Sequence, residues 1–242
     1  AQFADRWLGI EVGTDIALAN TIAREIIVSG LAHRDFIERA TTGFDEFAAS
    51  VEGWTLERGS EVTGVSTGFR DLDRKLAGLH PSNLVVVAAR PGMGKTSLAL
   101  NMAQSVALAG NTVAIFSMEM SREELVTRML CSKGRIDSQR LRTGRLTEAD
   151  FTKLSNAAGA LYKQNIFVDD SPGMTVTEIR AKCRRLRRRP GLDLVVIDYI
   201  QLMNGSGQEN RQQEIAMISR SLKDLARELH VPIIAISQLN RG

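Results

Sequence analysis

Residues 89–96, with the sequence ARPGMGKT, constrain the fold of this chain more than any other segment. They follow an apolar run at residues 84–88 and open a helical pattern at residues 96–109. A glycine-rich loop between a strand and a helix is the setting of a Walker A loop, which binds phosphate. Because its backbone N–H groups and the helix N-terminus face an anion, the sequence predicts an α/β fold with a nucleotide site.

The residues of this loop have distinct expected roles. Gly92 and Gly94 let the backbone pass close to a phosphate. Lys95 supplies a positive charge to the phosphate oxygens, and Thr96 offers a hydroxyl to magnesium, so ATP and Mg²⁺ are the predicted cofactors. The alternative, a glycine-rich turn with a chance GKT sequence, is disfavoured by the strand before it and the helix after it. The expected nucleotide-binding residues are Arg90, Pro91, Gly92, Met93, Gly94, Lys95, Thr96 and Ser97.

Short β-branched apolar runs alternate with helical patterns in the rest of the chain. This alternation is typical of a mainly parallel sheet with helices on both faces. The expected strands cover residues 84–88, 112–117, 166–169, 192–198 and 232–237. The expected helices cover residues 96–109, 121–133, 148–162, 177–189 and 212–229.

Three of the expected strands end in a polar residue that fits nucleotide chemistry. Asp198 closes the apolar run LVVID and fits a Walker B carboxylate that binds Mg²⁺, because ligands bind beyond the carboxyl ends of parallel strands. Glu119 follows residues 112–117, and we expect it one strand over from the phosphate loop, where it would deprotonate a water. Gln238 ends the last strand, where its amide would sense the γ-phosphate. The alternatives are helix caps, for Asp198 after its strand and for Glu119 before a helix near Ser121.

Composition and charge bound the class of protein. The 242 residues are 43% hydrophobic and 24% charged, as in ordinary globular proteins, and no apolar run is long enough for a membrane span. We therefore expect a cytoplasmic protein without a membrane partner. The distant cysteines, Cys131 and Cys183, lack metal-ligand spacing and are expected to be buried thiols. Residues 1–58 hold 10 Asp/Glu and 5 Lys/Arg, a net charge of −5, which leaves +8 for the rest of the total of +3.

The first 58 residues form a separate segment in this interpretation. Amphipathic patterns predict helices at residues 15–30, 34–40 and 44–51, and residues 57–60 form the junction. The predicted organisation is a helical N-terminal segment at residues 1–58, which is a linker or a fusion, and an ATPase domain at residues 59–242.

Five spaced motifs beyond the loop carry a resemblance to a known family. They are TGF with LD and GL at residues 67–79, FSMEM ending at Met120, LVVIDYIQLM at residues 194–203, RQQEI at residues 211–215 and SQLNR at residues 237–241. With the ARPGMGKT loop, they make residues 59–242 resemble the motor domain of bacterial and phage DnaB-type replicative DNA helicases.

The resemblance implies a RecA-like P-loop NTPase that assembles into a ring, usually a hexamer, and moves along single-stranded DNA. Carried onto this sequence, it implies that Lys95 and Thr96 bind nucleotide and magnesium and that Asp198 is the Walker B acid. Glu119 is then the catalytic base and Gln238 the γ-phosphate sensor. Residues 205–211 align with a loop that lies near the central channel in the family, so a DNA contact there is a hypothesis.

The chain departs from this family at both ends. The family continues beyond the SQLNR motif and supplies an arginine finger, worth about 10³ to 10⁵ in rate in related hydrolases, so we expect an incomplete fragment with weak hydrolysis. Residues 11–57 look more like a fragment of molybdopterin-dependent oxidoreductases such as formate dehydrogenase. A segment this short cannot enclose such a cofactor. Helices that pack on the motor or link subunits are the favoured alternative, and a fused or mis-assembled reading frame is a further hypothesis.

Two other functions remain open from the sequence. One is a nucleotide-binding module for ring assembly that does not hydrolyse ATP, and the other is a RecA-family recombinase-like or clock-type ATPase without unwinding activity. The arginine cluster at residues 184–189 suggests nucleic acid, but cations suit the end of a helix, so a solvated helix end is the preferred interpretation.

Overall fold

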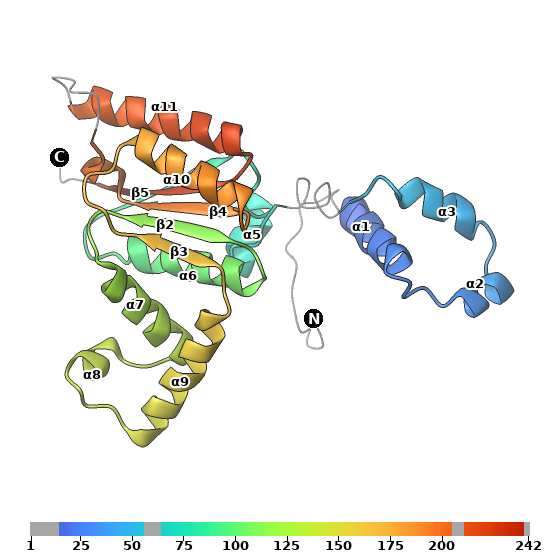
Figure 1. The fold of residues 1–242 in the computed structure, drawn as a ribbon, viewed down its shortest axis with the longest axis horizontal. Coiled ribbons are helices and arrows are strands. Elements are labelled where there is room, and N and C mark those ends of the chain that lie inside the picture. Colours follow the sequence, from blue (N-terminus) through green and yellow to red (C-terminus); the bar gives the residue numbers. More distant parts are fainter. Residues whose placement is uncertain (1–14, 56–63, 205–210, 240–242) are drawn as a thin grey trace. The chain divides into compact units, whose positions relative to one another are not determined.

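Figure 1 shows the fold in a computed structural model, which describes residues 15–55, 64–204 and 211–239. The chain divides into two compact units, Ala1–His80 and Pro81–Gly242. Each unit is described by itself. The boundary predicted between residues 58 and 59 lies outside the described residues, and residues 64–80 group with the first unit.

A five-stranded parallel sheet forms the centre of the second unit. Its strands are β1 (Leu84–Ala89), β2 (Val113–Ser117), β3 (Ile166–Asp169), β4 (Leu194–Asp198) and β5 (Ile233–Gln238). Every residue of β2 and β4 is buried, as expected for central strands covered on both faces. All four strand pairings are parallel, which confirms the predicted α/β class.

Helices cover both faces of this sheet (Figure 1). Helices α10 (Val176–Arg188) and α11 (Arg211–Leu229) lie on one face, and α6 (Lys95–Leu108) lies on the other. Helices α7 (Arg122–Gly134), α8 (Ser138–Arg142) and α9 (Glu148–Tyr162) extend beyond the sheet on the α6 side. The main core cluster lies between β2, β4, β5 and the pair α10 and α11, and it includes Phe116, Ile179, Ile197, Leu222 and Ile233.

The strand order corrects one expectation from the sequence. The order is β1-β5-β4-β2-β3, so β5 and β4 both separate β2 from the phosphate-loop strand β1. The expectation that Glu119, which follows β2, lies one strand over from the loop is therefore wrong. The direct neighbour of β1 is β5, which ends at Gln238.

The described part of the first unit is helical. It contains α1 (Asp15–Val28), α2 (Arg34–Ala40), α3 (Phe44–Val51) and α5 (Arg70–Leu76), of which the first three were predicted. Helices α1 and α3 pack together, and Thr21 and Val51 are buried. The guanidinium of Arg24 donates to the carbonyl of Glu52 at 2.8 Å, which ties α1 to the residue after α3.

The first of the quoted motifs has a structural role in this unit. The carboxylate of Asp73, which is 1% exposed, accepts from both the amide and the hydroxyl of Thr67, at 2.8 and 2.7 Å. It also accepts from the hydroxyl of Ser66 at 2.7 Å. Three hydrogen bonds satisfy this buried charge, so the TGF and LD residues fix the start of α5.

The cysteines and the arginine cluster behave as expected. Cys131 and Cys183 are free and buried, and burial raises the pKa of the Cys183 thiol to about 12. The cluster ends α10, where Arg184 pairs with Glu228 at 2.6 Å and Arg187 donates to the carbonyl of Leu192 at 3.2 Å. Both contacts fit a solvated helix end. No helix in the described ranges is both long and apolar enough to cross a membrane.

Candidate nucleotide-binding site

The phosphate loop is open along its backbone. It connects the end of β1 at Ala89 to the start of α6 at Lys95. Gly92 and Gly94 have φ angles of +76° and +85°, a region that favours glycine, and a Cβ atom at either position would meet nothing within 4 Å. Gly94 is the N-cap of α6 and supplies no side-chain acceptor, so the first N–H groups of this helix are free to bind an anion.

Asp198 is a buried carboxylate without a hydrogen-bond partner. It is the last residue of β4 and is 2% exposed, and neither of its oxygens makes a hydrogen bond of acceptable geometry within the described residues. A buried unpaired charge is costly, so its presence in a strand end points to a ligand. The alternative that Asp198 caps a helix is excluded, because a cap requires the hydrogen bond that these oxygens lack.

The charges around Asp198 come from the other predicted site residues. Burial raises the pKa of the Asp198 carboxyl, and the negative charge of Glu119 raises it further. The Thr96 side chain and the positive charges of Lys95 and Arg128 lower it. The Thr96 hydroxyl is thus close enough to affect the Asp198 pKa without forming a well-shaped hydrogen bond. Four predicted residues, Lys95, Thr96, Glu119 and Asp198, share one electrostatic neighbourhood.

Tyr199 completes this neighbourhood, although the sequence assigned it no role. The ammonium of Lys95 lies over its ring, 5.9 Å from the centroid. Burial raises the pKa of the Tyr199 hydroxyl, and Glu119 and Asp198 raise it further. Arg128, on α7, was also missed, since a single arginine in a helical pattern carries no signal of its own.

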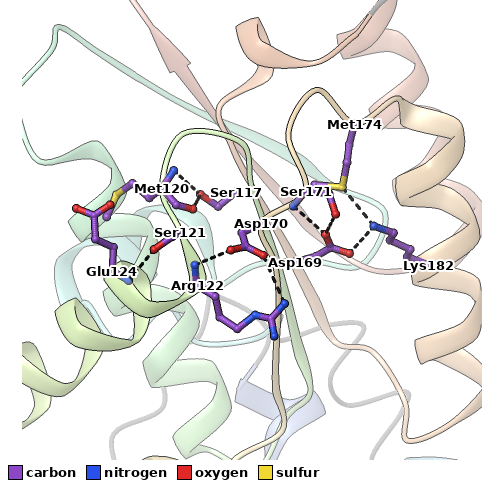
Figure 2. Close-up of polar contacts among 10 residues, drawn as sticks. All are labelled: Ser117, Met120, Ser121, Arg122, Glu124, Asp169, Asp170, Ser171, Met174 and Lys182. Carbon is purple, nitrogen blue, oxygen red and sulfur yellow. Dashed lines mark hydrogen bonds and ion pairs between the residues drawn. The ribbon is translucent and has the colours of Figure 1, made fainter.

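The turn that carries Glu119 is held by its neighbours (Figure 2). The Ser117 hydroxyl donates to the carbonyl of Met120 at 2.8 Å and accepts from its amide at 3.1 Å. The amide of Met118 donates to the carbonyl of Asp198 at 2.8 Å. Glu119 itself is exposed, and the N-cap of α7 is Ser121, so the alternative that Glu119 caps this helix is wrong.

Gln238 lies beside the phosphate loop. It pairs with Ala89 in the β1–β5 ladder, and the next amide, of Leu239, donates to the Ala89 carbonyl at 3.1 Å. The side chain of Gln201, in the 3-10 helix η1 (Ile200–Leu202), accepts from the Gln238 amide at 3.2 Å and donates to its carbonyl at 3.0 Å. Gln201 also donates to the Ser237 hydroxyl at 2.8 Å. The sequence placed Gln201 in a motif without revealing this contact between separate segments.

The site has the character of a nucleotide site rather than of an all-protein metal cage. Across residues 15–55, 64–204 and 211–239, no group of three or more His, Cys, Asp or Glu side chains is arranged to hold a metal. The unpartnered oxygens of Asp198 and the nearby Thr96 hydroxyl do fit a magnesium ion that takes its other ligands from phosphate and water.

The comparison with known families decides the classification. Residues 64–242 match the family described as DnaB-like helicase C terminal domain. This chain belongs to that family. It is 57% identical over 188 residues to the replicative DNA helicase DnaB of Geobacillus stearothermophilus, a match that covers 76% of this chain and 41% of the relative. The chain therefore spans about two fifths of the length of such curated relatives.

Two solved structures agree with this classification. One is a phosphate-loop relative solved as an isolated ATPase domain, which is 37% identical, has a TM-score of 0.70, and is matched over 85% of this chain and 72% of its own. The other is a DnaB-like replicative helicase, solved in a study of its interactions with primase. It is 34% identical with a TM-score of 0.71, over 93% of this chain and 57% of its own. The fold is that of RecA-like helicase ATPase domains.

The molybdopterin resemblance of residues 11–57 is not supported. A match over 93% of 242 residues covers about 225 residues, more than the 179 residues from 64 to 242. The likeness to a DnaB-like helicase therefore includes part of the segment before residue 64. The described part of that segment is three short helices, of 14, 7 and 8 residues, which is too little structure to surround a large cofactor.

The buried charge of Asp198 leads to a stability prediction. Because its pKa is raised in the folded protein, the folded state holds this proton more tightly than the unfolded chain does, and the carboxyl destabilises the protein once pH exceeds its folded pKa. An unsatisfied buried group costs about 1–3 kcal/mol. Asp198→Asn should therefore raise the Tm of the nucleotide-free protein at pH 7.5 by about 3 °C or more, and the gain should shrink as pH falls toward 4.

Thermal denaturation followed by circular dichroism measures this shift. Asp193→Asn is the matched control, because the Asp193 carboxylate accepts a hydrogen bond from the Thr112 amide at 2.7 Å and its loss should bring no gain. A lower Tm for Asp198→Asn than for the wild type at neutral pH would contradict the prediction.

Proposed function

We propose that this chain is the ATP-dependent motor of a replicative DNA helicase, in which ATP binding and hydrolysis drive movement along single-stranded DNA. The observation that carries the proposal is the gathering of Lys95, Thr96 and Glu119 around the unpartnered carboxylate of Asp198, at one edge of the sheet. The family supports a helicase rather than a RecA-family recombinase or a clock-type ATPase.

Each of these residues has a chemical task in the proposal. The free N–H groups of the loop and the ammonium of Lys95 bind the phosphates of ATP. A magnesium ion held by Thr96 and Asp198 supplies positive charge to the phosphate oxygens. Glu119 accepts the proton of the attacking water, and its exposed position at the tip of a turn leaves it free to do so.

Gln238 has the proposed task of sensing the γ-phosphate. Its backbone is the neighbour of Ala89, where the phosphate loop begins, so its side chain leaves the sheet beside that loop. Its position is defined by Gln201, which holds both its amide and its carbonyl.

The partners follow from the relatives. The relatives are named replicative DNA helicases, so we propose single-stranded DNA as the substrate track and the bacterial cytoplasm as the place of action. A homo-oligomer, a hexameric ring in the complete protein, is part of the same proposal. Residues 205–210, the proposed DNA-contacting loop, lie outside the described residues, and α11 begins directly after them at Arg211.

ATP hydrolysis with and without single-stranded DNA tests this function. We expect hydrolysis above that of Lys95→Ala, and a stimulation by single-stranded DNA of about fivefold or more, in the range of ordinary coupling between two sites. Duplex DNA of the same length is the control ligand. Hydrolysis no faster than that of Lys95→Ala, in both conditions, would reject the motor. Nucleotide binding without hydrolysis would instead favour a ring-assembly module.

A further inference from the structure

The residue that follows β3 contacts the first turn of α7. One oxygen of Asp170 accepts from the backbone amide of Arg122 at 2.9 Å, and the other lies 3.4 Å from its guanidinium (Figure 2). The hydrogen bond from this amide is the largest cause of the lowered pKa of the Asp170 carboxyl, so Asp170 accepts as a carboxylate. It gives α7 a second cap, from outside the helix, beside the N-cap Ser121.

The segment that presents Asp170 is itself anchored. The carboxylate of Asp169 accepts from the ammonium of Lys182 on α10 at 2.5 Å. It also accepts from the amide and the hydroxyl of Ser171, at 3.1 and 2.7 Å. Figure 2 shows this chain of contacts running from α10 to the start of α7. Asp170 is therefore held on both sides by bonds of its neighbours to each other and to α10.

The turn that bears Glu119 lies between two fixed points. On one side, Ser117 holds Met120, and the Met118 amide is bound to the carbonyl of Asp198. On the other side, the chain enters α7 at Arg122, whose amide is bound by Asp170. Because only Met118, Glu119, Met120 and Ser121 connect Ser117 to Arg122, the position of the α7 N-terminus sets the position of the Glu119 backbone.

We propose that Asp170 is a positioning residue for Glu119, which it holds in place through the amide of Arg122 and the first turn of α7. The effect on hydrolysis rests on the proposed role of Glu119 as the base, whereas the effect on the turn does not. Displacement of a catalytic group by about 1 Å costs up to about 10² in rate, so the loss of one of two caps should cost about tenfold.

Hydrogen exchange tests the mechanical part of the proposal. In Asp170→Ala the amide of Arg122 loses its acceptor, and exchange over residues 118–124 should rise at least about tenfold. Asp137→Ala is the matched control, because Asp137 caps α8 by accepting from the Gln139 amide at 2.7 Å and is far along the chain from the turn. This control should raise exchange near α8 only. Unchanged exchange over residues 118–124 in Asp170→Ala overturns the proposal, whatever hydrolysis does.

Single-turnover ATP hydrolysis tests the functional part. Asp170→Ala should hydrolyse ATP about tenfold more slowly than Asp137→Ala, with the Kd of a fluorescent ATP analogue unchanged within about twofold. Asp170→Asn keeps a side-chain acceptor and should recover most of the rate. In a Glu119→Gln background, Asp170→Ala should cause no further loss, since both changes remove one function. Equal rates for the two alanine variants, or a full further loss in the double variant, overturn the proposal.

The failure of the proposed function is distinguishable from this outcome. If Glu119→Gln alone leaves the rate unchanged, the role of Glu119 as base is rejected, and exchange alone then decides whether Asp170 holds the turn. If Glu119→Gln is slow and Asp170→Ala matches Asp137→Ala, the motor stands and Asp170 is a structural cap only.

Discussion

Lys95→Ala should lower single-turnover ATP hydrolysis by at least about 10²-fold, and nucleotide affinity should fall with it. Lys95 begins α6 and faces the region of Asp198 and Tyr199, so its ammonium is the positive side chain supplied by the phosphate loop itself. Arg128 also lowers the pKa of Asp198, but it comes from a different helix and cannot take the place of a charge at the loop.

The matched control for this variant is Lys163→Ala. Lys163 is exposed at the end of α9, and its replacement should leave hydrolysis within about twofold of the wild type. Isothermal titration with ATP and Mg²⁺ measures the affinity of both variants. Wild-type affinity and rate in Lys95→Ala would show that the ARPGMGKT loop does not bind the phosphates.

Glu119→Gln should leave nucleotide binding nearly intact and slow hydrolysis by about 10²-fold or more, the usual contribution of a general base. The amide keeps the size of the side chain and cannot accept a proton from water. Because Glu119 is exposed and its negative charge raises the pKa of Asp198, removal of this charge should not weaken the binding of an anionic nucleotide. The kinetic signature is a lower kcat with an unchanged Kd for ATP.

Glu123→Gln is the control, because Glu123 lies in the first turn of α7, four residues from Glu119, and is also exposed. Its rate should equal that of the wild type within about twofold. Equal slowing by both variants would attribute the effect to the charge of the turn rather than to a base.

The strands and long helices were predictable because burial leaves a strong pattern in the sequence. The fully buried strands β2 and β4 read as continuous apolar runs, and their observed bounds differ from the predicted ones by one or two residues. Helices α5 and α8 were missed because they have 7 and 5 residues, too few for a hydrophobic period to repeat.

Strand order was less accessible than the strands themselves. The placement of β5 between β1 and β4 depends on pairing between residues more than 140 positions apart, which no local pattern encodes. Asp198 and Lys95 were predicted from local motifs, and the structure brings them together. Tyr199 and Gln201 were not recognised as site neighbours, because their importance arises only when η1 meets the ends of β4 and β5.

The contact between Gln201 and the end of β5 has a mechanical consequence. One planar amide group engages the N–H and the carbonyl of Gln238 together with the hydroxyl of Ser237, so it cannot follow one of these groups and release another without breaking a bond. The tip of β5 and the turn Ile200–Leu202 therefore act as a single lever. A ligand that pushes on the strand tip moves the turn with it.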